Sequence, residues 1–191
     1  MELNKKTDLN RRDFMFSASG ILAGICFRSP LGGLYTPFDQ NKDLAEELSE
    51  KEAELVKNSS MAEDLMNYFG RGYSCAESIL MVSLNFMDLP DKYVWASCGF
   101  GGGMGKKDLC GLLTGGFMGL GFAAGEIGEE RNQGKSKCSA AVNEYWKWWQ
   151  SQAPLKCENI RTPGTSSKVC VRLGKLAAAK AQSLIEEMKA K

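Results

Sequence analysis

The sequence LCGLLTGGFMGLGFAAG, residues 109–125, decides the fold of this chain. It carries no charged side chain, yet it is shorter than the about 20 residues that a membrane-spanning helix needs. Gly111, Gly115 and Gly119 recur every four residues, so in a helix they form one face without side chains, which another backbone can approach closely. Each glycine weakens an isolated helix by up to about 1 kcal/mol, so contacts on several sides must stabilise this one. The stretch therefore predicts a buried central helix.

The remaining sequence also indicates helices. Two capping boxes, Ser60–Glu63 and Ser74–Glu77, predict helix starts, and Asp108 and Ser167 are the predicted caps of the central and the last helix. No segment shows the alternating pattern of a strand. Trp146, Trp148 and Trp149 form an aromatic cluster, for which core or dimer contacts are favoured over a binding platform. We therefore predict an all-α fold, a compact helical bundle around the glycine-rich central helix.

The composition excludes several classes of function. The 191 residues include no histidine, and 43% are hydrophobic and 25% charged, with a formal net charge of +1. The lack of histidine excludes Ser-His-Asp and Cys-His catalysis, histidine-ligated haem and histidine-containing zinc sites. The balanced charge and the absence of a basic patch argue against nucleic acid as a partner.

Seven cysteines, at positions 26, 75, 98, 110, 138, 157 and 170, are the candidates for redox or metal chemistry. No two lie within four positions of each other, so the sequence contains no CxxC pair, zinc knuckle or CxxCH haem-attachment motif. Cys75, Cys110 and Cys170 each fall in the first turn of a predicted helix, where the helix dipole should lower the thiol pKa. The alternative is that each is a small buried hydrophobic residue.

The N-terminus has the features of a targeting segment. Arg11 and Arg12 form a twin-arginine pattern, and residues 14–27 follow without a charge. We expect residues 1–30 to be a twin-arginine signal that contains Cys26, which implies the twin-arginine export machinery as a partner and a periplasmic or otherwise extracytoplasmic location. The alternative is a cytosolic amphipathic N-terminus. Residues 31–58 are predicted to be a linker and a charged helix with Leu44, Leu48 and Leu55 on one side, and residues 59–191 the compact domain.

Several motifs in this domain resemble a known family. Residues 72–77 (GYSCAE), 99–105 (GFGGGMG) and 110–116 (CGLLTGG), followed in order by Cys157 and Cys170, are similar to the C_GCAxxG_C_C family of redox-active proteins. The resemblance covers roughly residues 60–188. Leu112 departs from the alanine usual in the family, which affects only local packing.

The resemblance implies a site made of Cys75, Cys110, Cys157 and Cys170, with Gly111 beside them. It passes over Cys26, Cys98 and Cys138. The family is similar to the N-terminal part of split-Soret cytochromes, which implies an iron–sulfur site and electron transfer. A haem is not implied for this chain, because it has no haem-attachment motif and no histidine.

The leading hypothesis is an exported protein whose four cysteines bind a [2Fe–2S] or [4Fe–4S] cluster and pass electrons to an unidentified redox partner protein. A homodimer is possible through the tryptophan cluster. A second hypothesis is thiol–disulfide chemistry, in which Cys75–Cys110 and Cys157–Cys170 pair, either to cycle or to staple the domain. A third is a zinc-stabilised structural or interaction module.

Overall fold

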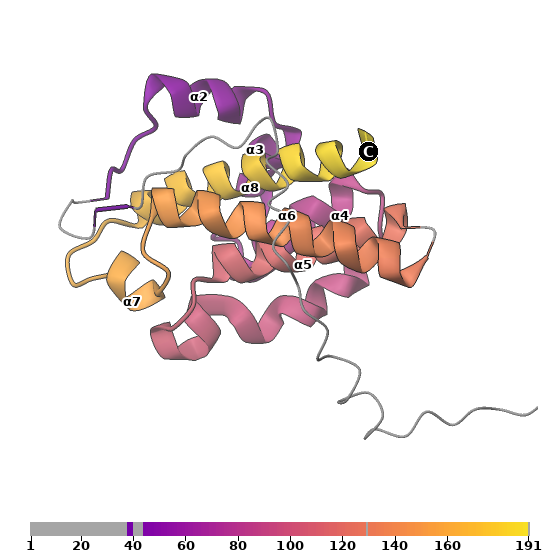
Figure 1. The fold of residues 1–191 in the computed structure, drawn as a ribbon. Coiled ribbons are helices and arrows are strands. Elements are labelled where there is room, and N and C mark those ends of the chain that lie inside the picture. The colour runs from indigo at the N-terminus through magenta and orange to yellow at the C-terminus, as the bar shows by residue number, and fades with distance from the viewer. Residues whose placement is uncertain (1–37, 40–43, 129, 191) are drawn as a thin grey trace, which may run out of the picture. The chain divides into compact units, whose positions relative to one another are not determined.

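Helix α5 (Gly111–Ile127) is the centre of the helical packing in the computed structural model, which describes residues 38–39, 44–128 and 130–190 (Figure 1). These residues all belong to the second of two compact units, Tyr35–Lys191. The predicted twin-arginine segment, residues 1–30, and its Cys26 lie outside the described residues.

The described chain is built from helices joined by turns. Helices α4, α6, α8 and η2 all pack against α5. Isolated bridges occur at two places, but the described part of the chain contains no strand. The all-α prediction is confirmed. Besides α5, the elements are α2 (Glu50–Lys57), α3 (Ser60–Asp64), η1 (Leu65–Asn67), α4 (Cys75–Phe86), η2 (Asp91–Phe100), η3 (Gly103–Lys107), α6 (Arg131–Gln152), α7 (Cys157–Ile160) and α8 (Ser167–Ala190).

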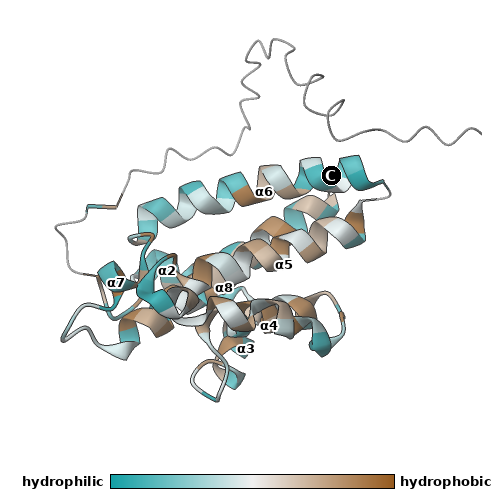
Figure 2. Ribbon diagram, turned by 90° about the horizontal axis from the view of Figure 1, so that it is seen from below, coloured by the Kyte–Doolittle hydropathy of each residue, from teal (hydrophilic) through white to brown (hydrophobic). Residues whose placement is uncertain are grey.

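The glycine face of α5 lies against α4, as predicted. A Cβ atom on Gly115 would stand 2.5 Å from the carbonyl oxygen of Ala76, and one on Gly119 would stand 2.5 Å from Oγ of Ser83. Any side chain at these positions would push the two helices apart. Figure 2 shows α5 with mostly apolar or neutral colours, whereas α6 has more hydrophilic colours along its length.

The aromatic residues of α6 pack into the core. Tyr145 and Trp149 are fully buried. The Tyr145 hydroxyl donates to the carbonyl oxygens of Leu112 (3.3 Å) and Ala177 (3.4 Å), which ties α6 to α5 and α8. The indole nitrogen of Trp149 donates to the carbonyl oxygen of Pro154 at 3.1 Å. The expectation of core contacts for the tryptophan cluster is confirmed for Trp148 and Trp149.

The helix starts agree with the predicted capping motifs in one case and differ in another. At α4, Ser74 and Glu77 form the complete predicted capping box. At α3, the cap is Ser59 instead of the predicted Ser60. Ser59 Oγ accepts from the Ala62 amide and also donates to the Gln182 side chain at 2.8 Å, so a partner on α8 fixes the helix start one residue earlier.

In its described part, residues 44–57, the charged stretch is helical only at its C-terminal end. Helix α2 begins at Glu50, so Leu44 and Leu48 precede it, although both pack against the core. The prediction of one helix with these leucines on one side is therefore wrong. The side chain of Ser49, whose backbone is extended, caps α2.

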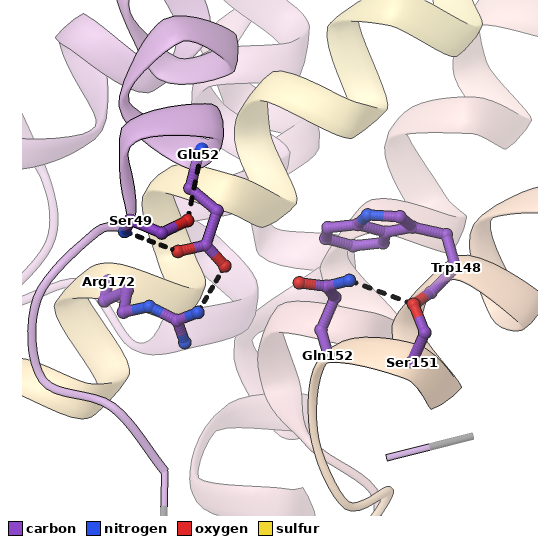
Figure 3. A network of polar contacts seen from close by, with 6 residues as sticks. All are labelled: Ser49, Glu52, Trp148, Ser151, Gln152 and Arg172. Atoms are coloured by element: carbon purple, nitrogen blue, oxygen red, sulfur yellow. Dashed lines mark hydrogen bonds and ion pairs between the residues drawn. The ribbon is translucent and has the colours of Figure 1, made fainter. Parts of the chain in front are cut away.

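An ion pair joins α2 to α8. The carboxylate of Glu52 accepts from both the Ser49 amide and the Arg172 guanidinium (Figure 3). The Arg172 side chain is largely buried, and its Nε atom has no hydrogen-bond partner in the described structure. Figure 3 also shows the end of α6, where Gln152 donates to the Ser151 hydroxyl.

Among the residues that the structure describes, no helix combines the length and the apolar character needed to cross a membrane.

Candidate functional site

Four cysteines lie at the starts of four different helices. Cys75 is the first residue of α4, Cys157 is the first residue of α7, and Cys170 lies in the first turn of α8. Cys110 is the residue immediately before α5. The sequence predicted helix starts for three of them. It missed α7 because a helix of four residues has no periodicity to detect.

The structure brings these four cysteines to one pocket of about 370 Å³. Its wall is completed by two cationic side chains and by small or apolar residues: Gly102, Lys107, Gly111, Leu112, Ile160 and Arg161. We call this the four-cysteine pocket. Its members are spread over almost a hundred residues of sequence, so only tertiary folding assembles it.

A short pairing of two backbone segments places Cys110 beside the start of α7. The Cys110 amide donates to the carbonyl oxygen of Leu155 at 2.8 Å, and the Cys157 amide donates to that of Asp108 at 2.7 Å. Asp108 therefore does not cap α5 as predicted. Its carbonyl oxygen accepts the hydrogen bond from the first residue of α7, and its carboxylate lies 3.6 Å from the ammonium group of Lys156.

Gly111 allows α4 and α5 to meet at the pocket. A Cβ atom there would stand 3.1 Å from the Ala76 amide nitrogen, 3.1 Å from the Phe100 carbonyl oxygen and 3.2 Å from Cβ of Cys75. These contacts are tight on three sides. Gly111 therefore acts as a spacer, and it lets Cys75 and Cys110 face the same pocket.

A turn with left-handed backbone borders the pocket before α5. Gly102, Gly103 and Gly105 have positive φ, and so do Met104 (57°) and Lys107 (58°). Non-glycine residues rarely adopt this conformation, which costs about 1 kcal/mol or more for each. Gly103 is also required by space, because its Cβ atom would overlap the backbone of Asp108. The turn thus holds Lys107 at the pocket wall.

Arg161 is a site residue that the sequence analysis did not identify, because it only appeared as part of a turn. Its amide donates to the carbonyl oxygen of Cys157 at 2.7 Å, which closes α7. Its guanidinium Nη1 lies 3.8 Å from the sulfur of Cys170 and donates to it. The guanidinium also interacts electrostatically with the thiols of Cys75 and Cys157. Arg161 therefore places a positive charge near three of the four cysteines.

Burial raises the pKa of the Cys75 and Cys110 thiols, contrary to the predicted lowering. It raises that of Cys75 to about 11, with the neighbouring Cys170 and Cys157 adding to the effect. It raises that of Cys110 to about 12, although backbone amides of α5 oppose it. The pKa of Cys157 is also raised, first by burial and then by Cys170. At these helix starts, the loss of hydration outweighs the dipole and the amide hydrogen bonds.

The four pocket cysteines match the ligand number of an iron–sulfur cluster. All six cysteines in the described part of the chain are free thiols. Within the described ranges, no three histidine, cysteine, aspartate or glutamate side chains converge closely enough to hold one metal ion. An iron–sulfur cluster takes four cysteine ligands and spreads them over two or more iron atoms, so its ligands surround a space and do not meet at a point. The four-cysteine pocket supplies this number of ligands.

The other described cysteines lie elsewhere. Cys98 is exposed on η2, and Cys138 is half-buried on α6. Neither lines the four-cysteine pocket.

Comparison with protein families identified a match. The family model described as "Putative redox-active protein (C_GCAxxG_C_C)" matches residues 73–184, a range that contains all four pocket cysteines. Neither a curated protein nor a solved structure matches the chain.

Proposed function

The chain belongs to the C_GCAxxG_C_C family of redox-active proteins, and from this premise we propose that it is an exported electron-transfer protein. In this proposal Cys75, Cys110, Cys157 and Cys170 hold an iron–sulfur cluster. The observation that carries the proposal is that four cysteines from four separate helix starts line one pocket.

The raised thiol pKa values favour metal binding over thiol catalysis. A catalytic thiol needs a lowered pKa so that thiolate is present at neutral pH. Cys75 and Cys110, with pKa values of about 11 and 12, are protonated at neutral pH. Such thiols lose their protons when a metal cation compensates for the negative charge.

Two cations and two apolar side chains in the pocket lining also favour a cluster that transfers electrons. Arg161 and Lys107 line the pocket and offset part of the negative charge of four cysteine ligands. Leu112 and Ile160, both buried, limit the access of water. When bound, a cluster would supply the capacity to gain and lose one electron at a time, at a potential set by these surroundings.

Export is proposed from the twin-arginine pattern at Arg11 and Arg12 and the uncharged run that follows it. The test is a fusion of residues 1–40 to a reporter that is active only after export. Transport should depend on a functional twin-arginine pathway and be lost in Arg11→Lys/Arg12→Lys. A reporter that stays in the cytoplasm would contradict this part of the proposal.

The cluster is tested by purifying the protein without oxygen and measuring iron, acid-labile sulfide and the visible absorption spectrum. We expect both elements, and we expect Cys110→Ser and Cys170→Ser to lose them. The matched control is Cys98→Ser/Cys138→Ser, which leaves the pocket unchanged and should retain the cluster.

Three other results would contradict the cluster. A colourless protein without iron after reconstitution would rule it out. Native disulfides between pocket cysteines, found by mass mapping, would favour thiol–disulfide chemistry. Bound zinc without redox activity would favour a structural role.

A further inference from the structure

Five residues that line the four-cysteine pocket come from two segments, residues 102–108 and 156–161, which we call the pocket mouth. The segments are joined by the hydrogen bond from the Cys157 amide to Asp108 and by the bridge between Leu109 and Lys156. Cys157 is half-buried here and most residues of both segments are exposed, so this side of the cysteine site adjoins solvent. A protein that exchanges electrons with the site would approach this mouth.

The pocket mouth is positively charged, although the rest of the predicted mature chain is not. It carries four cations (Lys106, Lys107, Lys156 and Arg161) and two carboxylates (Asp108 and Glu158), a net charge of +2. Residues 31–191 as a whole carry nineteen basic and twenty acidic side chains, a net charge of −1. Positive charge is therefore concentrated around the site.

Part of this positive charge is not paired with a carboxylate. Lys156 pairs with both carboxylates of the mouth, at 3.6 Å from Asp108 and 3.5 Å from Glu158. In the part of the chain that the structure describes, no ion pair engages Lys106, Lys107 or Arg161. The mouth thus presents Lys106 and Lys107 to solvent without a carboxylate partner, while Arg161, also exposed, donates to the sulfur of Cys170.

An exposed apolar residue lies among these charges. Met104 is at the tip of the left-handed turn and is 40% exposed. Apolar contact with a charged rim, over a small area, is the usual arrangement at electron-transfer interfaces, which bind weakly and are guided by charge.

We propose that the pocket mouth is the docking surface for an acidic redox protein. This inference rests on the proposed electron transfer, and it adds the place and the charge of the partner. One electron passes from the reduced site to the oxidised centre of the partner, or in the reverse direction. Complementary charge increases the rate of encounter, and salt reduces this increase.

A matched pair of acceptor proteins tests the proposal: cytochrome c, which is basic, and succinylated cytochrome c, which has the same haem but an acidic surface. The holoprotein is reduced, mixed with each acceptor in a stopped-flow instrument, and followed by haem absorbance as one electron reduces the ferric haem. We expect the succinylated form to react about tenfold faster at low salt than at 0.2 M salt, and native cytochrome c to show the opposite salt dependence.

Charge-reversal variants locate the effect. At low salt, Lys106→Glu/Lys107→Glu should react faster with native than with succinylated cytochrome c, the reverse of the unsubstituted protein. Lys106→Glu alone, which leaves the pocket lining intact, should reduce the difference between the two rates. The control is Arg131→Glu/Lys135→Glu, with the same change in net charge at the far end of α6, about 30 Å along the helix from its last residue. Iron content is measured in every variant. Equal effects of the two double variants would overturn the proposal.

A small anionic acceptor, ferricyanide, separates protein docking from attraction of any anion. Met104→Ala should slow electron transfer to succinylated cytochrome c about fourfold, the effect of about one buried methylene, and leave the ferricyanide rate unchanged. If only ferricyanide responds to the charge variants, the mouth attracts small anions and the docking proposal is wrong.

The two proposals fail separately. Absence of iron would contradict the cluster, and the mouth is then tested through the pocket thiols in Cys26→Ser/Cys98→Ser/Cys138→Ser protein, in which only the pocket cysteines remain. Dianionic 5,5′-dithiobis(2-nitrobenzoate) should lose reactivity in Lys106→Glu/Lys107→Glu about tenfold more than neutral 2,2′-dithiodipyridine does. An equal loss for both reagents would show that the mouth has no effective positive field.

Discussion

The guanidinium group of Arg161 donates a hydrogen bond to the sulfur of Cys170 over 3.8 Å, while the Arg161 backbone closes the helix that begins at Cys157. One residue therefore both shapes the segment that carries one cysteine and places a positive charge next to another. Hydrogen bonds to sulfur and nearby charge are two of the factors that set the potential of a cysteine-bound cluster.

Replacing Arg161 should lower the reduction potential of the bound cluster. Loss of the cation disfavours the more negative, reduced state, so Arg161→Gln is expected to shift the midpoint on the order of 50 mV downwards, close to the 59 mV that corresponds to a tenfold change for one electron. Potentiometric titration measures the shift. Arg161→Lys retains the charge and should move the potential less, and Arg131→Gln, on α6, should not move it. An unchanged midpoint in Arg161→Gln would contradict a tuning role.

The metal-free protein should lose stability at alkaline pH because of its buried thiols. Burial raises the pKa of Cys75 to about 11 and that of Cys110 to about 12, from an ordinary value of 9.0. The unfolded chain therefore releases these protons at lower pH than the folded chain does. Their contribution to stability is complete below about pH 9 and is lost as the pH rises towards 11–12, with a slope of up to about 1.4 kcal/mol per pH unit for each thiol.

Urea unfolding of metal-free protein at several pH values between 8 and 10.5 tests this dependence. Lysines also titrate in this range, so the informative quantity is the difference from Cys110→Ala, which should have a shallower slope. The exposed Cys98 provides the control, since Cys98→Ser should keep the slope of the unsubstituted chain. Parallel curves for Cys110→Ala and the unsubstituted chain would show that the folded-state pKa of Cys110 is not raised.

The central helix could be predicted from the sequence because its signal is local. The glycine spacing in residues 109–125 indicated both the helix and its close neighbour, and the structure shows that neighbour to be α4. Ser74 and Glu77 lie three residues apart, so their capping box could also be predicted from the sequence. Features of this kind depend on residues within one or two turns of each other.

The surroundings of the cysteines could not be predicted in the same way. Whether a helix start lowers the pKa of a thiol depends on its burial, which is set at Cys75 and Cys110 by segments distant in sequence. The contact of Arg161 with Cys170 likewise depends on the position of the end of α7 relative to the start of α8. Asp108 had the sequence features of a cap, but its backbone pairs with the segment before α7, and this long-range pairing determines where α5 begins.

Alanine substitutions of two adjacent serines can test which of them caps α3. Ser59→Ala removes the cap and the contact with Gln182, and should reduce the free energy of unfolding by about 1–2 kcal/mol. Ser60→Ala should change it by less than about 0.5 kcal/mol, because the Ser60 hydroxyl makes only a long contact of 3.4 Å with the same glutamine. Thermal or urea unfolding of the two variants measures the difference. A larger effect at Ser60 would restore the capping box predicted from the sequence.

Two glycines of α5 should respond in opposite directions to the same substitution. Gly115→Ala places a methyl group 2.5 Å from the backbone oxygen of Ala76, which cannot move without separating α4 from α5, so a loss of about 1–3 kcal/mol is expected. Gly121 has no atom within 4 Å of the added methyl group, so Gly121→Ala should gain up to about 1 kcal/mol from helix propensity alone.

Unfolding free energies of the two variants, together with their iron content, separate packing from propensity. Because Gly115 lies one turn after Gly111 on the face that meets α4, its substitution should also displace Cys75 from Cys110 and reduce iron retention, whereas Gly121→Ala should retain iron fully. Stabilisation by both alanines would mean that α4 and α5 are not in close contact. Loss of stability without loss of iron in Gly115→Ala would show that the cysteine site tolerates separation of the two helices.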